Sequence, residues 1–291
     1  MPVCGRSLVW LGHQPPTLDL TSFKDYLHSK FCNQYARLQY SYILKYGSLM
    51  DNPSELNNLP TSTRSNVLKA LINLSKYQGQ YETFKSKLKN YGIKWLSADT
   101  SFNSFLAIIN NNHSTLNQWI KDSMAILPEN EKLFLRFTLL TGLRKNEAIQ
   151  SFNQIIKLAR ECKLSEYFNE ELGILEHFKY GEMFLRNSKN VYISIIDRDL
   201  VQKISNSQPV YYTTIRKHIE KNKLRLRIKE LRSYYATFLR KNGILAELVD
   251  LLQGRIPKSV FARHYLKIDD LKTLVAQVLT VTSVMESDLL S

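Results

Sequence analysis

The sequence lacks long apolar runs and has few cysteines, and each absence excludes a class of protein. No stretch of 18 or more apolar residues occurs in its 291 residues, so no spanning helix is expected. Its three cysteines, Cys4, Cys32 and Cys162, form no CxxC pair and have no histidines at zinc-finger spacing, which argues against a disulfide framework and a zinc site. The apolar run Leu8–Leu11 is too short for a secretory signal, so we expect an intracellular protein.

Common catalytic motifs are missing as well. The chain contains no HExxH, no GxxxxGK(S/T), no GxSxG and no cysteine credibly patterned with a histidine. Paired carboxylates are also absent from the basic C-terminal region. The chemistry therefore has to come from arginine, lysine and tyrosine side chains.

What the sequence has in excess is positive charge. Lys and Arg number 40 against 26 Asp and Glu, which gives a net charge of +14, and both halves of the chain, divided at Leu127, are basic. Hydrophobic residues make up 44%, too many for a disordered chain. Two folded basic halves favour a polyanion held from two sides over a single basic tail.

Hydrophobic spacing predicts a mostly helical chain. The expected helical ranges are 17–48, 63–77, 80–90, 100–110, 116–125, 129–140, 145–158 and most of 209–279. In contrast, apolar residues alternate with other residues in 180–196, and a turn-forming run lies at 187–190. This pattern predicts a β-hairpin.

Proline and asparagine mark the expected boundaries between segments. Loop signals between Asn52 and Pro60 predict one boundary near residue 60, and a linker is expected near 122–128 because Pro128 opens a new helix. The expected segments are 1–60, 61–126 and 127–291, of which the first matches no known role.

Three motifs carry candidate chemistry. In the first, TGLRKNE, Gly142 breaks a helix so that Arg144 lies at the start of the next one, where a guanidinium beside helix amides can bind phosphate. Glu147, one turn later, can orient that arginine. A plain Arg–Glu surface pair is the simpler alternative.

The second and third motifs lie further along the chain. Lys229 and Arg232 are spaced i, i+3 and so share one helix face, which suits an anion but also fits a solvated basic face. Gly254 and Arg255 follow a helix, and Tyr265 comes ten positions after Arg255. Tyr265 is one of 16 tyrosines, so only its order and spacing relative to the other motifs can mark it as a candidate.

Taken in order, TGLRxxE, a basic hairpin, KxxR with an aromatic helix, a Gly-Arg turn and a tyrosine resemble the catalytic domain of the tyrosine recombinases, the phage-integrase family. The resemblance covers 129–267, and residues 61–125 resemble the core-binding, DNA-binding domain that precedes it. Lys229 and Arg255 stand where the bacterial pattern has histidine, and the last interval is one residue longer. These departures resemble the archaeal virus and plasmid integrases of fusellovirus type. The implied fold is mainly α, with a helical core-binding domain and a mostly α catalytic domain that carries one small β-sheet.

The resemblance also implies roles for single residues. Tyr265 would attack phosphorus and form a 3′-phosphotyrosyl bond, while Arg144 and Arg232 bracket the phosphate oxygens. Lys229 and Arg255 would add contacts, and neutral Lys229 is a candidate general base. Lys189, in the hairpin turn, matches the lysine that protonates the leaving oxygen, with Arg186 as a rival. Glu147 is a supporting residue, and no metal or other cofactor is expected.

The implied partner is double-stranded DNA at attachment sites. Further phosphate contacts are expected at eight basic residues: Arg216, Lys217, Lys221, Lys223, Arg225, Arg227, Lys69 and Lys76. The family implies a homotetramer on paired sites, in which the apolar C-terminal stretch docks on a neighbouring subunit; packing on its own domain is the alternative. No membrane partner is expected, and the place of action would be the nucleoid in the cytoplasm, that of the host if the gene is viral.

Two other functions fit the same residues. A type IB topoisomerase uses similar chemistry, although the SKxxY arrangement usual there is absent from Ser259–Tyr265. A catalytically inactive DNA-binding protein of the same fold is the second, and the intact set of candidate residues argues against it.

Overall fold

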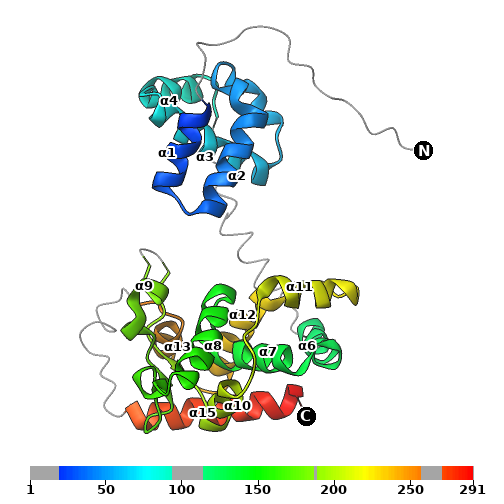
Figure 1. Cartoon of the computed structure of the whole chain (residues 1–291). Helices are drawn as coiled ribbons and strands as arrows, with labels where there is room; N and C mark the ends of the chain where they lie inside the picture. The colour runs from blue at the N-terminus through cyan, green and yellow to red at the C-terminus, as the bar shows by residue number, and fades with distance from the viewer. Residues whose placement is uncertain (1–19, 94–113, 187–188, 257–270, 291) are drawn as a thin grey trace. The chain divides into compact units, whose positions relative to one another are not determined.

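The computed structural model describes residues 20–93, 114–186, 189–256 and 271–290. The chain divides into two compact units, Met1–Asn111 and Asn112–Ser291 (Figure 1). Each unit has its own hydrophobic core.

Unit 1 is a small helical bundle. Its elements are α1 (Leu20–Lys30), α2 (Asn33–Tyr46), the 3-10 turns η1 (Gly47–Met50) and η2 (Pro53–Asn58), α3 (Thr61–Tyr77) and α4 (Tyr81–Asn90). Phe23, Ile43, Leu71 and Phe84 meet in its core. The single helix expected over 17–48 is two helices, because the backbone is extended at Cys32. Helices α1 and α2 share this core with α3 and α4. The described part of the expected segment 1–60 therefore folds together with the residues that follow it.

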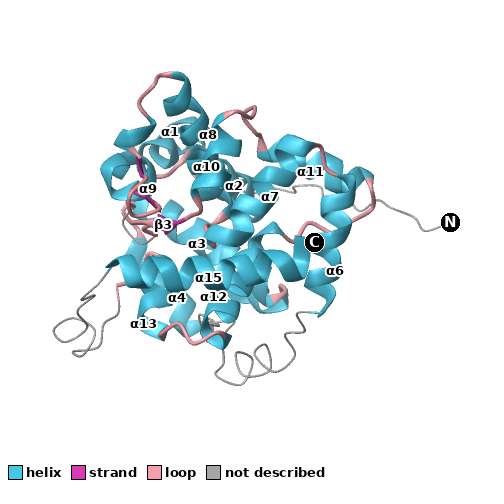
Figure 2. Ribbon diagram, turned by 90° about the horizontal axis from the view of Figure 1, so that it is seen from below, coloured by secondary structure: helices cyan, strands magenta, loops and turns pink. Residues whose placement is uncertain are grey.

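Unit 2 is also mainly helical, which confirms the predicted fold class (Figure 2). Its helices are α6 (Ser114–Ile126), α7 (Glu129–Thr141), α8 (Lys145–Arg160), α9 (Gly181–Phe184), α10 (Arg198–Ser205), α11 (Tyr212–Lys221), α12 (Leu231–Lys241), α13 (Ala246–Leu252) and α15 (Leu271–Leu290). Short 3-10 turns, η3 (Leu164–Glu166), η4 (His177–Tyr180) and η5 (Ile228–Glu230), lie between them.

Helix α6 belongs to unit 2. Leu116, Trp119 and Ile120 lie in the core of this unit, where α6 packs on α7 and α15, and Leu127 is buried as well. The division of the chain at Asn111 and Asn112 therefore precedes the linker expected near 122–128. The helix expected over 100–110 lies outside the described residues.

The small sheet exists, but the predicted hairpin within 180–196 is wrong. Strands β1 (Phe168–Asn169), β2 (Ile174–Leu175) and β3 (Ser194–Ile195) form an antiparallel sheet in the order β1-β2-β3. The first arm of the expected hairpin is helix α9, because the Leu185 N–H donates to the Gly181 carbonyl in a helical turn. The strands among the described residues have two residues each, too few for an alternating pattern to be recognised in the sequence.

The last helix packs on its own unit. Leu274, Val278, Met285 and Leu289 on α15 are buried in the core of unit 2. Of the two placements considered for the C-terminal stretch, the structure adopts the one within the same chain. Among the described helices, none combines the length and apolar content of a membrane span.

Candidate active site

The turn between α7 and α8 places Arg144. Helix α7 ends at Gly142, whose φ of 62° is left-handed, and a Cβ there would lie 2.2 Å from Cδ1 of the buried Tyr235 ring. Only glycine fits both constraints. Arg144 then lies at the N-cap of α8 in extended backbone, as the helix break predicted.

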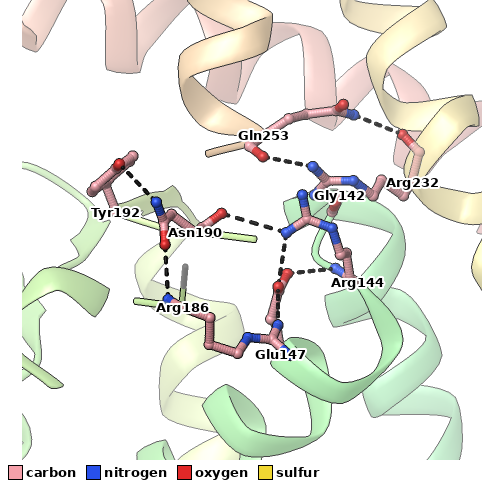
Figure 3. A network of polar contacts seen from close by, with 8 residues as sticks. All are labelled: Gly142, Arg144, Glu147, Arg186, Asn190, Tyr192, Arg232 and Gln253. Atoms are coloured by element: carbon pink, nitrogen blue, oxygen red, sulfur yellow. Dashed lines mark hydrogen bonds and ion pairs between the residues drawn. The ribbon is translucent and has the colours of Figure 1, made fainter. Parts of the chain in front are cut away.

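Glu147 anchors this turn from inside the unit. Its side chain has no solvent exposure, and its Oε2 accepts the Arg144 backbone N–H at 3.1 Å. Its Oε1 accepts Nη1 of Arg144 at 2.8 Å and Nη2 of Arg186 at 2.7 Å (Figure 3). A buried charge is costly unless it is paired, and here two guanidinium groups compensate the carboxylate. The pair is therefore not a plain surface ion pair.

Arg232 reaches the same place from α12. Its Nη1 donates to the Gly142 carbonyl at 2.9 Å and its Nη2 to the Gln253 carbonyl at 2.6 Å, while Gln253 Nε2 returns a bond to the Arg232 carbonyl. Burial above all, together with the positive charges of Arg144 and Arg255, lowers the pKa of Arg232 to about 10. The guanidinium remains charged at neutral pH.

The turn after α13 brings Arg255 to the cluster. Gly254 is left-handed, with φ 69°, and a Cβ there would overlap the Asn190 carbonyl oxygen at 1.7 Å. That carbonyl accepts Nη1 of Arg144 at 3.4 Å, so the turn, the Asn190 backbone and Arg144 meet at one point. Arg255 is 61% exposed and pairs with Asp250 at 3.1 Å.

The cluster has donors left over for a ligand. A guanidinium carries five N–H donors. Within the described residues, Arg144 uses only Nη1, and Arg232 uses one donor from each of Nη1 and Nη2. The four positive charges of Arg144, Arg186, Arg232 and Arg255 outnumber the two carboxylates, Glu147 and Asp250, so the cluster keeps a net positive charge. Charged hydrogen-bond donors of this kind suit an oxyanion such as a phosphate.

The remaining candidate catalytic residues are Lys229, Lys189 and Tyr265. Lys229 lies in η5, exposed, three residues before Arg232, and pairs with no described acidic residue. Lys189 is exposed and precedes Asn190 in the chain. It lies between helix α9 and strand β3 rather than between two strands, as the predicted hairpin required. Tyr265 lies outside the described residues. Of the predicted set, the structure thus brings together Arg144, Glu147, Arg232 and Arg255.

Two residues of this network were missed in the sequence. Asn190 Oδ1 accepts the Arg186 backbone N–H at 2.8 Å, and its Nδ2 donates to the Tyr192 hydroxyl at 3.2 Å. Gln253 contributes both its side chain and its carbonyl. In the sequence Asn190 indicated only a turn, and no side-chain pattern reports which backbone carbonyls will face an arginine.

The expected phosphate-contacting residues fall into two groups. Those on the surface with exposed side chains are Arg216, Lys217, Lys221, Lys223 and Arg225 in unit 2, and Lys69 and Lys76 in unit 1. Arg227 differs, because its side chain is only 17% exposed; it pairs with Glu230 at 2.7 Å and donates to Thr115 of α6 at 3.2 Å. Its contacts tie α6 to the turn before α12.

In the parts of the chain that the structure describes, no three His, Cys, Asp or Glu side chains converge as metal ligands. The arrangement instead offers fixed cationic hydrogen-bond donors.

Comparison with known proteins adds one match. A family model described as archaeal phage integrase matches residues 120–274, more than half of the chain. The match spans the arginine cluster and Tyr265. A search of curated proteins finds no match.

Proposed function

The chain belongs to the archaeal phage integrase family and is an integrase-type DNA recombinase; from this premise we propose that it cuts and rejoins DNA through a covalent bond to Tyr265. The observation that carries the proposal is the cluster of Arg144, Arg232 and Arg255, whose unused donors suit one phosphate. The cluster lies within the matched residues and at the turns that the family motifs mark.

The proposed cleavage is a phosphoryl transfer to tyrosine. The Tyr265 Oη–P bond forms while the bond from phosphorus to the 5′ oxygen breaks, leaving a 3′-phosphotyrosyl end. The phenolic proton leaves to neutral Lys229 or to water, and Lys189 gives a proton to the 5′ oxygen. Rejoining is the reverse attack by a 5′-hydroxyl of a second strand. Because water attacks at no step, the reaction is a strand transfer and not a hydrolysis.

The arginines would stabilise the transition state. Negative charge grows on the non-bridging oxygens as phosphorus becomes five-coordinate, and donors fixed in advance interact more strongly with that charge than water does. The loss of one such donor typically costs about 10²–10³ in rate. Nearby cations would also lower the pKa of Tyr265 from about 10, which makes the phenol a better nucleophile. Metal ions and nucleotides have no part in this scheme.

We further propose that exposed lysines and arginines on both units contact duplex DNA and that the enzyme acts as a tetramer on paired sites. Exposed cations on α11 and the turn after it, and on α3, are suited to phosphate contacts without base recognition.

A covalent-trapping experiment tests the proposal. The full chain is incubated with a library of nicked duplexes with randomised flanks, in which a short 3′ fragment diffuses away after cleavage and traps the adduct. We expect wild type to form a complex that resists denaturing gel electrophoresis, with none from Tyr265→Phe and at least 10²-fold less from Arg144→Ala. Arg198→Ala, which removes an exposed arginine paired with Glu170, is the matched control and should react normally.

Other outcomes would point elsewhere. An adduct that survives Tyr265→Phe would overturn the nucleophile. Relaxation of supercoiled plasmid lacking any recovered sequence would favour a topoisomerase. Salt-sensitive DNA binding without any adduct would favour a binding protein that has lost catalysis.

A further inference from the structure

Asn190 lies at the centre of the arginine cluster, yet the proposed chemistry gives it no part. Its carbonyl accepts Nη1 of Arg144, and Gly254 lies so close to that carbonyl that no side chain fits between them. Its side-chain oxygen accepts the Arg186 backbone N–H at 2.8 Å. The backbone at Asn190 is therefore held by the bonds to Arg144 and Arg186, which Figure 3 shows, and by the close approach of Gly254.

Arg186 is held at the same time from its other end. Its Nη2 donates to Glu147 Oε1 at 2.7 Å, the oxygen that also accepts Arg144 Nη1. The bond from the Arg186 N–H to Asn190 Oδ1 joins these two anchored residues directly. Lys189, the exposed residue next to Asn190, is thus attached to backbone that is fixed relative to Arg144.

We propose that Asn190 is a positioning residue, which through its side-chain bond to the Arg186 N–H holds the backbone of Lys189 where its ammonium reaches the leaving 5′ oxygen. The inference rests on the proposed function and adds a residue to it. A lysine has a long stem with many rotamers, so the placement of its Cα decides how often the ammonium reaches a given atom. Proton transfer requires approach to hydrogen-bond distance, and a displacement of about 1 Å can cost about 10² in rate.

A purely structural role for Asn190 predicts a different effect of its replacement on the cleavage rate. General loosening of the cluster would also displace Arg144 and weaken stabilisation of the phosphate oxygens. Loss of Lys189 placement alone would slow only the protonation of the leaving oxygen. The two effects separate when the leaving group no longer needs a proton.

A substrate with sulfur in place of the bridging 5′ oxygen provides that separation. Its leaving group departs as a thiolate, which is stable near neutral pH because thiols have a pKa of about 8.5. Single-turnover cleavage is measured with oxygen and sulfur versions of a duplex recovered from the trapping library. The enzymes are wild type, Asn190→Ala, Asn190→Ser, Lys189→Ala and Asn169→Ala. Both Asn190 variants keep the carbonyl that accepts Arg144.

Asn169→Ala is the matched control. Asn169 is likewise partly buried in unit 2, and its Oδ1 accepts one nearby backbone N–H, that of Leu172, at 3.1 Å. It lies on β1 and has no contact with the arginine cluster among its described bonds. We expect it to cleave both substrates at the wild-type rate.

We expect Asn190→Ala and Asn190→Ser to cleave the oxygen substrate about 10–100-fold more slowly than wild type and the sulfur substrate within about threefold of it, as Lys189→Ala does. The melting temperature of each variant shows whether it folds. If Asn190→Ala does not fold, the rates of Asn190→Ser, the smaller change, test the proposal. A folded variant equally slow on both substrates, or as fast as Asn169→Ala on oxygen, would overturn the role of Asn190. Failure of the proposed function has a separate signature, because wild type would then form no adduct at all.

Discussion

Glu147 holds the arginine cluster together from a position without solvent access. One of its oxygens accepts from both Arg144 and Arg186, and the other caps the backbone N–H of Arg144. At the scale of single residues, the site depends on this carboxylate as much as on the arginines, since it fixes the direction of a side chain that would otherwise sample many rotamers.

Replacement of Glu147 tests this dependence. Glu147→Gln removes the charge and leaves one acceptor oxygen for two guanidinium groups, so we expect the free energy of unfolding of unit 2 to fall by about 1–3 kcal/mol. Arg144 would lose its fixed direction, and adduct formation should slow by about 10²-fold. Denaturant unfolding and single-turnover trapping measure the two effects.

Glu171→Gln is the control for this change. Glu171 forms an ion pair with Lys272 at 2.7 Å, but both side chains are mostly exposed, at 77% and 64%. Exposed pairs contribute about 0–1 kcal/mol, so stability and trapping should both stay near wild type. A Glu147→Gln variant that matches Glu171→Gln in both measurements would contradict the anchoring role.

At the scale of elements, the ends of helices could be predicted because the backbone rules for proline and glycine are strong. Pro128 before α7 and left-handed Gly142 after it set the ends of that helix, and the start of α8 followed. The presence of one small sheet was predicted, but the positions of its strands were not, because strands of two residues depend on tertiary packing. The convergence of Arg144, Arg232 and Arg255 was predicted from family motifs. Their backbone acceptors at Gly142, Asn190 and Gln253 depend on the packing of turns far apart in sequence.

The sheet is tied to α8 by a buried polar network. His177 Nδ1 shares a hydrogen bond of 2.7 Å with the Tyr167 hydroxyl, and its Nε2 one of 2.8 Å with Ser194 Oγ on β3. The same tyrosine hydroxyl donates to Ser151 on α8 at 2.9 Å. All four side chains are buried, and burial lowers the pKa of His177 to about 3.

This pKa makes the stability of unit 2 depend on pH. The folded unit keeps His177 neutral, whereas in the unfolded chain the imidazole gains a proton below about pH 6.5. The contribution is constant above that pH and is lost as pH falls from 6.5 towards 3, at about 1.4 kcal/mol per unit. We expect a loss of about 2 kcal/mol by pH 5, measured by hydrogen exchange of the amides in β2 and β3.

Two histidine variants check the source of that dependence. His177→Gln should lower stability at pH 7 but flatten the decline between pH 6.5 and 5. His28→Gln, in unit 1, removes a histidine outside this network and should leave the decline unchanged. An equally steep decline in His177→Gln would show that another group causes it.

At the scale of the whole molecule, the net charge of +14 separates into two uses. The arginines of the cluster are committed to carboxylates and carbonyls and keep only part of their donors for one phosphate. The exposed cations on the surface of each unit are suited to the many phosphates along a duplex. The first set would govern cleavage and the second affinity.

The salt dependence of DNA binding tests the second use. Lys217, Lys221 and Lys223 are exposed on α11 and the turn after it. Their joint replacement by alanine should reduce the slope of log affinity against log salt by about 2–3, since each phosphate contact contributes about 0.9. Binding titrations between low and moderate salt measure the slope.

Three other lysines provide a charge-matched control. Lys157, Lys163 and Lys203 are exposed on or just after α8 and α10. Their replacement removes the same charge from unit 2 but should leave the slope close to wild type. Equal changes in slope for both triple variants would mean that net charge, rather than the α11 surface, determines DNA binding.

The proposal that DNA is cut through a bond to Tyr265, beside the arginine cluster, is tested most directly by locating that bond. The trapped adduct is digested with protease and nuclease, and the peptide that carries the residual nucleotide is sequenced by mass spectrometry. We expect the modification on Tyr265, attached through a 3′ phosphate. A nucleotide on any other residue, or one joined through a 5′ phosphate, would contradict it.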